Sequence, residues 1–223
     1  SSGVVYRDDN QNGIQEPGEP PLPNIKVLGV LSENLTLTDS AGRYNLVFDL
    51  AVDTVRAIAP VVYHDIQPPH RLVNGISQNQ NFGLWFQPDV TDLGISATHT
   101  AAMRPGFDNS LHLRVSNTGT KSVEATVGLK LPADVQYLGA DPAPDLILGD
   151  SLVWLNVGIP FLGSADFAVQ IQLSSTIPLG TLLTFHSTVL PENTDQNSTD
   201  NTFALETTVV GAYDPNDKQV WPG

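Results

Sequence analysis

The stretch LHLRVSNTGTKSVEATVGLKL, residues 111–131, holds two runs in which apolar and polar residues alternate, separated by turn-forming residues. The same period of two recurs in FAVQIQL at residues 167–173. Alternation of this kind is typical of strands that bury one face. No comparable segment has apolar residues at helical spacing over three turns. The 18 Gly and 17 Pro are spread among the runs, as turns and edge strands require, so the sequence predicts an all-β protein.

A break in this pattern predicts two domains. The strand-like run 82–86 ends at Gln87-Pro88, and a new alternating run begins at Leu93. Each half has a size that suits an immunoglobulin-like, Greek-key β-sandwich, so we expect two such sandwiches in tandem. The predicted segments are a first sandwich at residues 1–87, a second at residues 88–212, and a polar linker to a following module at residues 213–223.

The composition limits the partners. The chain has 223 residues, of which 40% are hydrophobic, which is enough for a packed core. Its 24 acidic and 10 basic residues give a formal charge of −14, which repels nucleic acid and anionic membranes and attracts cations. There are no cysteines, so disulfides, thiolate metal sites and Cys nucleophiles are excluded. We therefore expect no nucleic-acid partner and regard metal ions as the natural charged ligands.

The sequence has no long apolar run and no charged-then-apolar leader. It begins with Ser-Ser-Gly, and its only methionine is Met103. We therefore expect a segment of a longer protein, with any signal or anchor outside it and no direct insertion into a membrane.

The loop RDDNQNGIQEPGE, residues 7–19, gathers residues that can bind a cation. Counted from Asp8, its oxygen-bearing residues fall at the offsets of a twelve-residue calcium loop, with Gly13 at the sharp turn. Such a loop can supply the about six to eight oxygens that Ca²⁺ requires. The flanking GVVY and NIKVLGVL indicate strands, so the loop would join two strands of a sandwich. The alternative is a polar Asn-Gly turn whose charges face water.

The first 87 residues resemble the B-type repeat of Gram-positive serine-aspartate repeat adhesins and the related collagen-adhesin B-type, prealbumin-like domains. The resemblance depends on GVVYRDDNQNGIQEPGEPPLPNIKVLGV, LTDSAGRYNLVFDL and NFGL. It implies a rigid stalk unit with a calcium loop. Asp39 is a further ligand candidate, although its Asp-Ser-Ala-Gly setting is also that of an ordinary turn. The ligands that the resemblance implies are Asp8, Asn10, Asn12, Ile14 through its carbonyl, Glu16 and Glu19.

Some of these relatives cross-link a lysine to an Asn or Asp. Lys26 is the only lysine of the first predicted domain, and its neighbours Ile25 and Val27 are in the inward phase of the strand. We therefore expect Lys26 to face solvent.

Residues 88–212 resemble a bacterial surface repeat marked by an Asn-Thr-Gly turn and a Leu-Pro-x-x-Val segment. Here these are Asn117-Thr118-Gly119 and the segment from Leu131 to Val135. The final AYDPNDKQVWP resembles a junction of large surface proteins that Gram-negative bacteria export by type IX secretion. The resemblance implies immunoglobulin-like domains in tandem, without catalysis, on an extracellular bacterial surface.

A second cation site is suggested by ENTDQNSTDN, residues 192–201. The candidate ligands are Asp195, Asn197 and Asp200, with Glu192 and Asn201 in the same cluster. Their offsets match no fixed ligand template, and a solvated acidic hairpin tip explains them as well.

The GDSL sequence at residues 149–152 imitates a serine esterase motif, with Ser151 as the nucleophile. An esterase has a helix after this motif, whereas LVWLNV indicates a strand, and no histidine of the chain has an aspartate three residues before it. We therefore interpret Ser151 as a turn residue and predict that the chain is not an enzyme.

Together these features predict a calcium-stabilised stalk, spacer or adhesive module of a large extracellular bacterial surface protein. The expected partners are neighbouring modules of the same polypeptide and proteins or glycans of a host or surface. Two alternatives remain open: a subunit of an extracellular filament, and an accessory domain of a secreted hydrolase.

Overall fold

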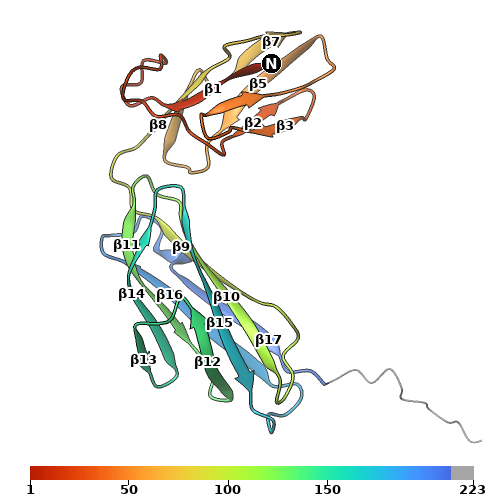
Figure 1. The fold of residues 1–223 in the computed structure, drawn as a ribbon, viewed down its shortest axis with the longest axis vertical. Coiled ribbons are helices and arrows are strands. Elements are labelled where there is room, and N and C mark those ends of the chain that lie inside the picture. Colours follow the sequence, from red (N-terminus) through yellow and green to blue (C-terminus); the bar gives the residue numbers. More distant parts are fainter. Residues whose placement is uncertain (212–223) are drawn as a thin grey trace, which may run out of the picture. The chain divides into compact units, whose positions relative to one another are not determined.

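The computed structural model describes residues 1–211, and its regular secondary structure is almost entirely β-strand (Figure 1). The one helix in this range is a single 3-10 turn, η1 (Ser198–Asp200). No helix of the described chain is long and apolar enough to cross a membrane. The predicted all-β sandwich fold is confirmed. The linker expected at residues 213–223 lies outside the described residues.

Contacts divide the chain into two compact units. Unit 1 comprises Ser1–Val90 and Thr118–Lys121, and unit 2 comprises Thr91–Asn117 and the chain from Ser122 onward. The domain boundary after residue 87 stays a prediction.

Unit 1 has two four-stranded sheets. One has the order β4-β1-β8-β6 and the other the order β3-β2-β5-β7. All neighbouring strands are antiparallel except β1 and β8, which run parallel. The strands are β1 (Ser2–Arg7), β2 (Lys26–Gly29), β3 (Leu35–Leu37), β4 (Arg43–Asn45), β5 (Val52–Ile58), β6 (His64–Gln67), β7 (Arg71–Asn74) and β8 (Phe82–Phe86).

The core of unit 1 is made by alternate residues of these strands. Val27 and Val55 come from one sheet, and Val5 and Phe82 come from the other; all four are fully buried. Lys26 is exposed beside the buried Val27, as the alternation predicted.

Unit 2 has a four-stranded sheet of order β12-β15-β10-β9 and a five-stranded sheet of order β13-β14-β11-β16-β17. Its core includes Trp154 and Phe167, whose ring centroids lie 4.8 Å apart. The strands are β9 (Leu93–His99), β10 (Asp108–Asn117), β11 (Val123–Lys130), β12 (Val135–Asp141), β13 (Leu146–Leu148), β14 (Ser151–Ile159), β15 (Ser164–Leu173), β16 (Leu182–Pro191) and β17 (Thr202–Thr208).

The two alternating runs of residues 111–131 lie in β10 and β11, which belong to different sheets of unit 2. Leu111 and Leu113 of the first run and Val127 and Leu129 of the second are all buried in one core. The turn between the runs therefore carries the chain from one layer of the sandwich to the other, which is why this stretch determines the fold.

Candidate metal centres

The predicted calcium loop of unit 1 begins at the end of β1 and ends beside the same strand. Arg7 N donates a hydrogen bond to the Pro20 carbonyl over 2.9 Å, and Tyr6 and Pro21 form an antiparallel bridge. Residues 8–19 therefore form a loop whose two ends are joined by backbone hydrogen bonds.

Asp8 lies at the base of this loop and is 1% exposed. Its Oδ1 accepts a hydrogen bond from Asn12 N (3.1 Å), and its Oδ2 accepts one from Gly13 N (2.8 Å). Gly13 has a φ of 73°, a conformation that glycine adopts without strain. A Cβ on Gly83 of β8 would lie 2.8 Å from both Cβ and Oδ2 of Asp8. Glycine at position 83 therefore leaves the space that the carboxylate of Asp8 occupies.

The other predicted side-chain ligands close the loop on itself. Glu19, 9% exposed, accepts hydrogen bonds from Asp9 N (3.1 Å) and Glu16 N (3.0 Å). Glu16 accepts hydrogen bonds from the side-chain amides of Asn10 (2.6 Å) and Asn12 (3.1 Å). The structure therefore brings five of the predicted ligands into one hydrogen-bonded loop: Asp8, Asn10, Asn12, Glu16 and Glu19.

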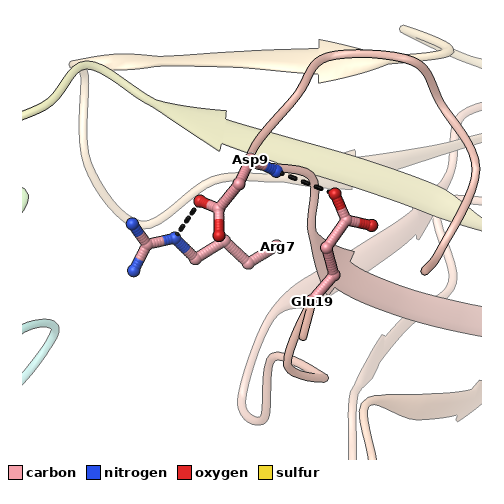
Figure 2. Close-up of polar contacts among 3 residues, drawn as sticks. All are labelled: Arg7, Asp9 and Glu19. Atoms are coloured by element: carbon pink, nitrogen blue, oxygen red, sulfur yellow. Dashed lines mark hydrogen bonds and ion pairs between the residues drawn. The ribbon is translucent and has the colours of Figure 1, made fainter. Parts of the chain in front are cut away.

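The charge around this loop is negative. Figure 2 shows that Asp9 directs its carboxylate to Arg7, at 2.6 Å, and its backbone N–H to Glu19. Arg7 thus neutralises an acid that is not a predicted ligand. Burial raises the pKa of Tyr6 to about 12, and the negative charges of Asp8 and Glu19 act in the same direction. The carboxylates of Asp8 and Glu19 thus make the surroundings of Tyr6 negative, which favours a cation there.

The remaining predicted ligands of unit 1 are Ile14 and Asp39. Ile14 is exposed, and its N–H donates to Asn12 Oδ1 over 2.8 Å. Asp39 lies in the turn between β3 and β4, where its Oδ1 accepts hydrogen bonds from Ala41 N and Arg43 N, both at 2.9 Å. The Asp39 carboxylate thus stabilises its own turn, which is the alternative that the sequence left open.

A second acidic group assembles in unit 2. Asp92, Asp195 and Asp200 each offer a carboxylate oxygen, and these three atoms lie within 4.8 Å of one another. Within residues 1–211 this is the one place where three acidic or histidine side chains come so close. Asp92 directly precedes β9, whereas Asp195 and Asp200 lie in the connection between β16 and β17.

Backbone hydrogen bonds hold the two segments of this group together. Leu93 N donates to Asp195 Oδ2 over 3.0 Å, and Gln196 N donates to the Thr91 carbonyl over 2.9 Å. Asn197, the remaining sequence candidate, is exposed, and its Oδ1 accepts a hydrogen bond from Thr199 Oγ1 over 2.6 Å. Asn197 therefore shapes the turn, while Asp195 and Asp200 meet Asp92.

One oxygen of the Asp200 carboxylate lacks a hydrogen-bond partner in the described chain. Its Oδ1 is buried without a hydrogen-bond partner within residues 1–211, and the same holds for Asn201 Oδ1 and Thr91 Oγ1. Asn201 is only 8% exposed and Thr91 only 2%. Burial raises the pKa of Asp200, and the negative charges of Asp92 and Asp195 raise it further. Buried oxygens normally have partners, and a divalent cation that prefers oxygen ligands would supply one here.

Sequence reasoning missed Asp92. Its signal was weak: a Thr-Asp pair directly before an alternating run, in a position that reads as a strand boundary. Asp92 is 4% exposed and reaches the other two acids because β9 contacts both β16 and β17. That contact is a property of the sandwich and not of the local sequence.

The esterase-like motif has a structural role. Ser151 begins β14 directly after the turn that follows β13, and its Oγ donates to Asp150 Oδ1 over 3.1 Å. A strand therefore stands where an esterase has its helix, as expected from LVWLNV.

No protein family model matches the chain, and no curated protein sequence matches it. Among solved structures, a membrane-anchored protein of Corynebacterium diphtheriae has 9% identity and a TM-score of 0.40 over 89% of this chain. The match covers 55% of that protein, so this chain spans about half its length.

A CARDB domain of Pyrococcus furiosus, described as a complex with di-metal ions, has 13% identity and a TM-score of 0.38, covering 56% of this chain and 99% of that domain. The fimbrial protein FimP of Actinomyces oris has 9% identity and a TM-score of 0.27, covering 93% of this chain and 66% of that protein.

Proposed function

We propose that this chain is a non-catalytic, calcium-stabilised stalk, spacer or adhesive module of an extracellular bacterial surface protein. The observation that supports this function most directly is the group formed by Asp92, Asp195 and Asp200, in which the buried Asp200 Oδ1 lacks a hydrogen-bond donor within the described chain. Hard, oxygen-seeking Ca²⁺ is the ion that such a donor set fits.

Calcium changes the energetics of this group. Three carboxylates within 4.8 Å of one another repel when all are ionised, so the empty group destabilises the fold at neutral pH. An ion that binds only the folded chain stabilises it by RT ln(1 + [L]/Kd), about 2.7 kcal/mol when its concentration is a hundred times Kd. Extracellular calcium at roughly millimolar concentration would fill even a weak site.

The loop of residues 8–19 is the second proposed calcium site. The amides of Asn10 and Asn12 now donate to Glu16, and Asp8 and Glu19 are already positioned by backbone N–H groups. Each carboxylate has about four lone-pair directions, so one or two hydrogen bonds leave capacity for an ion. We infer that Ca²⁺ replaces the amide groups as the positive partner of Glu16, which frees the amide oxygens to turn toward the ion.

Each proposed ion would stiffen its own unit. In unit 2 the ion would join the start of β9 to the connection between β16 and β17. In unit 1 a second ion would fix the loop of residues 8–19, which is otherwise held by its own side chains. A spacer requires that stiffness and no catalytic group, which agrees with the structural role of Ser151.

The test is calorimetric unfolding of the chain in roughly millimolar CaCl₂ and in excess chelator. We expect a higher Tm in calcium, and loss of that increase for the unit 2 transition in Asp92→Asn/Asp200→Asn. Asp134→Asn, an exposed acid of unit 2, is the matched control and should retain the full increase. Identical transitions with and without chelator would refute the calcium proposal.

A further inference from the structure

The sheet β3-β2-β5-β7 of unit 1 has an unusual outward face. Residues of its strands alternate between buried and accessible positions, and the paired register places the accessible ones on one side. An outward face of an antiparallel sheet is normally polar. Here the outward residues are Leu35, Leu37, Lys26, Leu28, Val52, Thr54, Arg56, Ile58, Leu72 and Asn74, and we call this set the leucine face.

The leucine face is mainly apolar. Six of its ten residues are Leu, Ile or Val, and Leu72, Leu35 and Leu37 are 68%, 54% and 52% exposed. The other sheet of unit 1 differs, because the exposed residues of β4 and β6 are Arg43, Asn45, Asp65 and Gln67, all polar. Contiguous exposed apolar surface on a folded domain marks an interaction site.

The leucine face contains no acidic residue, although unit 1 as a whole is acidic. Residues 1–90 contain ten Asp and Glu but only five Lys and Arg, yet the leucine face has two cations and no acid. The register sets Lys26 beside Leu37 and Ile58, and Arg56 beside Leu28, so the two cations lie on one diagonal among apolar side chains. Within residues 1–211, neither cation forms an ion pair.

This charge pattern selects the occupant. Two copies joined through the same face would bring four cations together without a carboxylate between them, which is unfavourable. An anionic membrane is repelled by a chain of formal charge −14. A polypeptide that presents carboxylates among apolar side chains matches the leucine face in both respects.

We propose that the leucine face is a docking surface for an acidic, apolar segment of a partner protein. Leu35, Leu37 and Leu72 supply the buried contact, while Lys26 and Arg56 set the orientation by pairing with carboxylates. The face contains no residue of either proposed calcium site, so it goes beyond the spacer function and can fail independently of it.

The test uses the ¹⁵N-labelled chain and, as probe, a short capped peptide of alternating leucine and glutamate. We expect amide shift changes on titration to concentrate in β2, β3, β5 and β7. The double variant Lys26→Glu/Arg56→Glu should lose about tenfold in affinity, and Leu35→Ser/Leu37→Ser should lose a similar factor. Arg43→Glu, an exposed cation of the other sheet, is the matched control and should bind as the parent does.

Folding is not at risk in these variants because every substituted side chain faces outward, and the calorimetric transition of unit 1 checks this directly. Three results would overturn the proposal: peptide shifts that ignore Lys26→Glu/Arg56→Glu, binding of phosphatidylserine vesicles in place of the peptide, or self-association that the same double variant abolishes. The second result would assign the face to a lipid surface and the third to a second copy of the chain.

Discussion

The two acidic sites, the loop of unit 1 and the group of unit 2, differ in how their carboxylates are stabilised. In the loop of unit 1, Asp8 and Glu19 each receive two backbone N–H groups from the loop itself. In the group of unit 2, Asp195 receives two N–H groups, while Asp200 Oδ1 has no donor within the described chain. The first site therefore holds its shape through local hydrogen bonds, and the second is held by the sandwich against the repulsion of its own charges.

This difference separates two kinds of dependence. Carboxylates that are satisfied by protein donors contribute to stability with or without an ion. Carboxylates that face one another contribute only when a cation is present, and they weaken the fold when it is absent. Substitutions in the two sites should therefore respond differently to a chelator.

The largest effect is expected for Asp8→Ala. Removal of its buried carboxylate leaves the Gly13 N–H without an acceptor and leaves Asn12 N with the Asn10 side chain alone, which should cost about 3 kcal/mol of unfolding free energy even in chelator. Chemical denaturation with and without calcium measures it. Asp9→Ala is the control, because Asp9 is exposed and, within residues 1–211, its carboxylate pairs with the half-exposed Arg7 alone, so little change is expected. Equal losses for the two variants would break the proposed contrast.

The next effect concerns Asp200→Asn. In chelator this variant should be as stable as the parent or more stable, because the amide removes one of three mutually repelling charges. In calcium it should lack the increment of about 2.7 kcal/mol that a well-filled site provides. The decisive measurement is the difference between the denaturation midpoints of the variant in calcium and in chelator. A loss of stability that is the same in both buffers would make Asp200 a purely structural acid.

A pair of glycines sharpens the comparison sterically. In Gly83→Ala the new methyl group meets Asp8 at 2.8 Å, so we expect a loss of about 2 kcal/mol. In Gly94→Ala the nearest atom is Asp200 Oδ2 at 3.1 Å, the end of a side chain that can move, so the loss should be smaller. Thermal unfolding of both variants tests the order. The reverse order would mean that the unit 2 group is the more rigid of the two.

The smallest effect is a pH dependence. The pKa of Asp200 in the folded chain is raised above its unfolded value of 3.8. Protonation of Asp200 therefore stabilises the fold, and this contribution is fully present below pH 3.8. It is lost as the pH rises through the folded pKa. In chelator, the parent should therefore lose stability relative to Asp200→Asn over this range. In calcium the sign should reverse, because the ion binds the ionised carboxylates. Unfolding curves across the acidic range decide between these outcomes.

The sequence predicted the features that depend on neighbouring residues, namely the strands and the loop of residues 8–19. It missed a contact that depends on how the strands pack. Alternation in residues 111–131 and 167–173 identified strands of both sheets of unit 2, and the spacing from Asp8 to Glu19 identified a loop that does gather its acids. Asp195 and Asp200 were recognised as a cluster, but Asp92 was not, because only the packing of β9 beside β16 and β17 brings it there. No spacing rule connects residues whose proximity depends on strand order.

The parallel pairing of β1 and β8 has a mechanical consequence for unit 1. Because the first and last strands of the unit run in the same direction, the start of β1 and the end of β8 lie at opposite ends of their shared ladder. Tension applied along the chain would load all hydrogen bonds of that ladder together in shear rather than open them one by one. Pulling unit 1 by its ends in a force spectrometer should therefore give a single high rupture peak, whereas a low, stepwise extension would show that this ladder does not resist the pull.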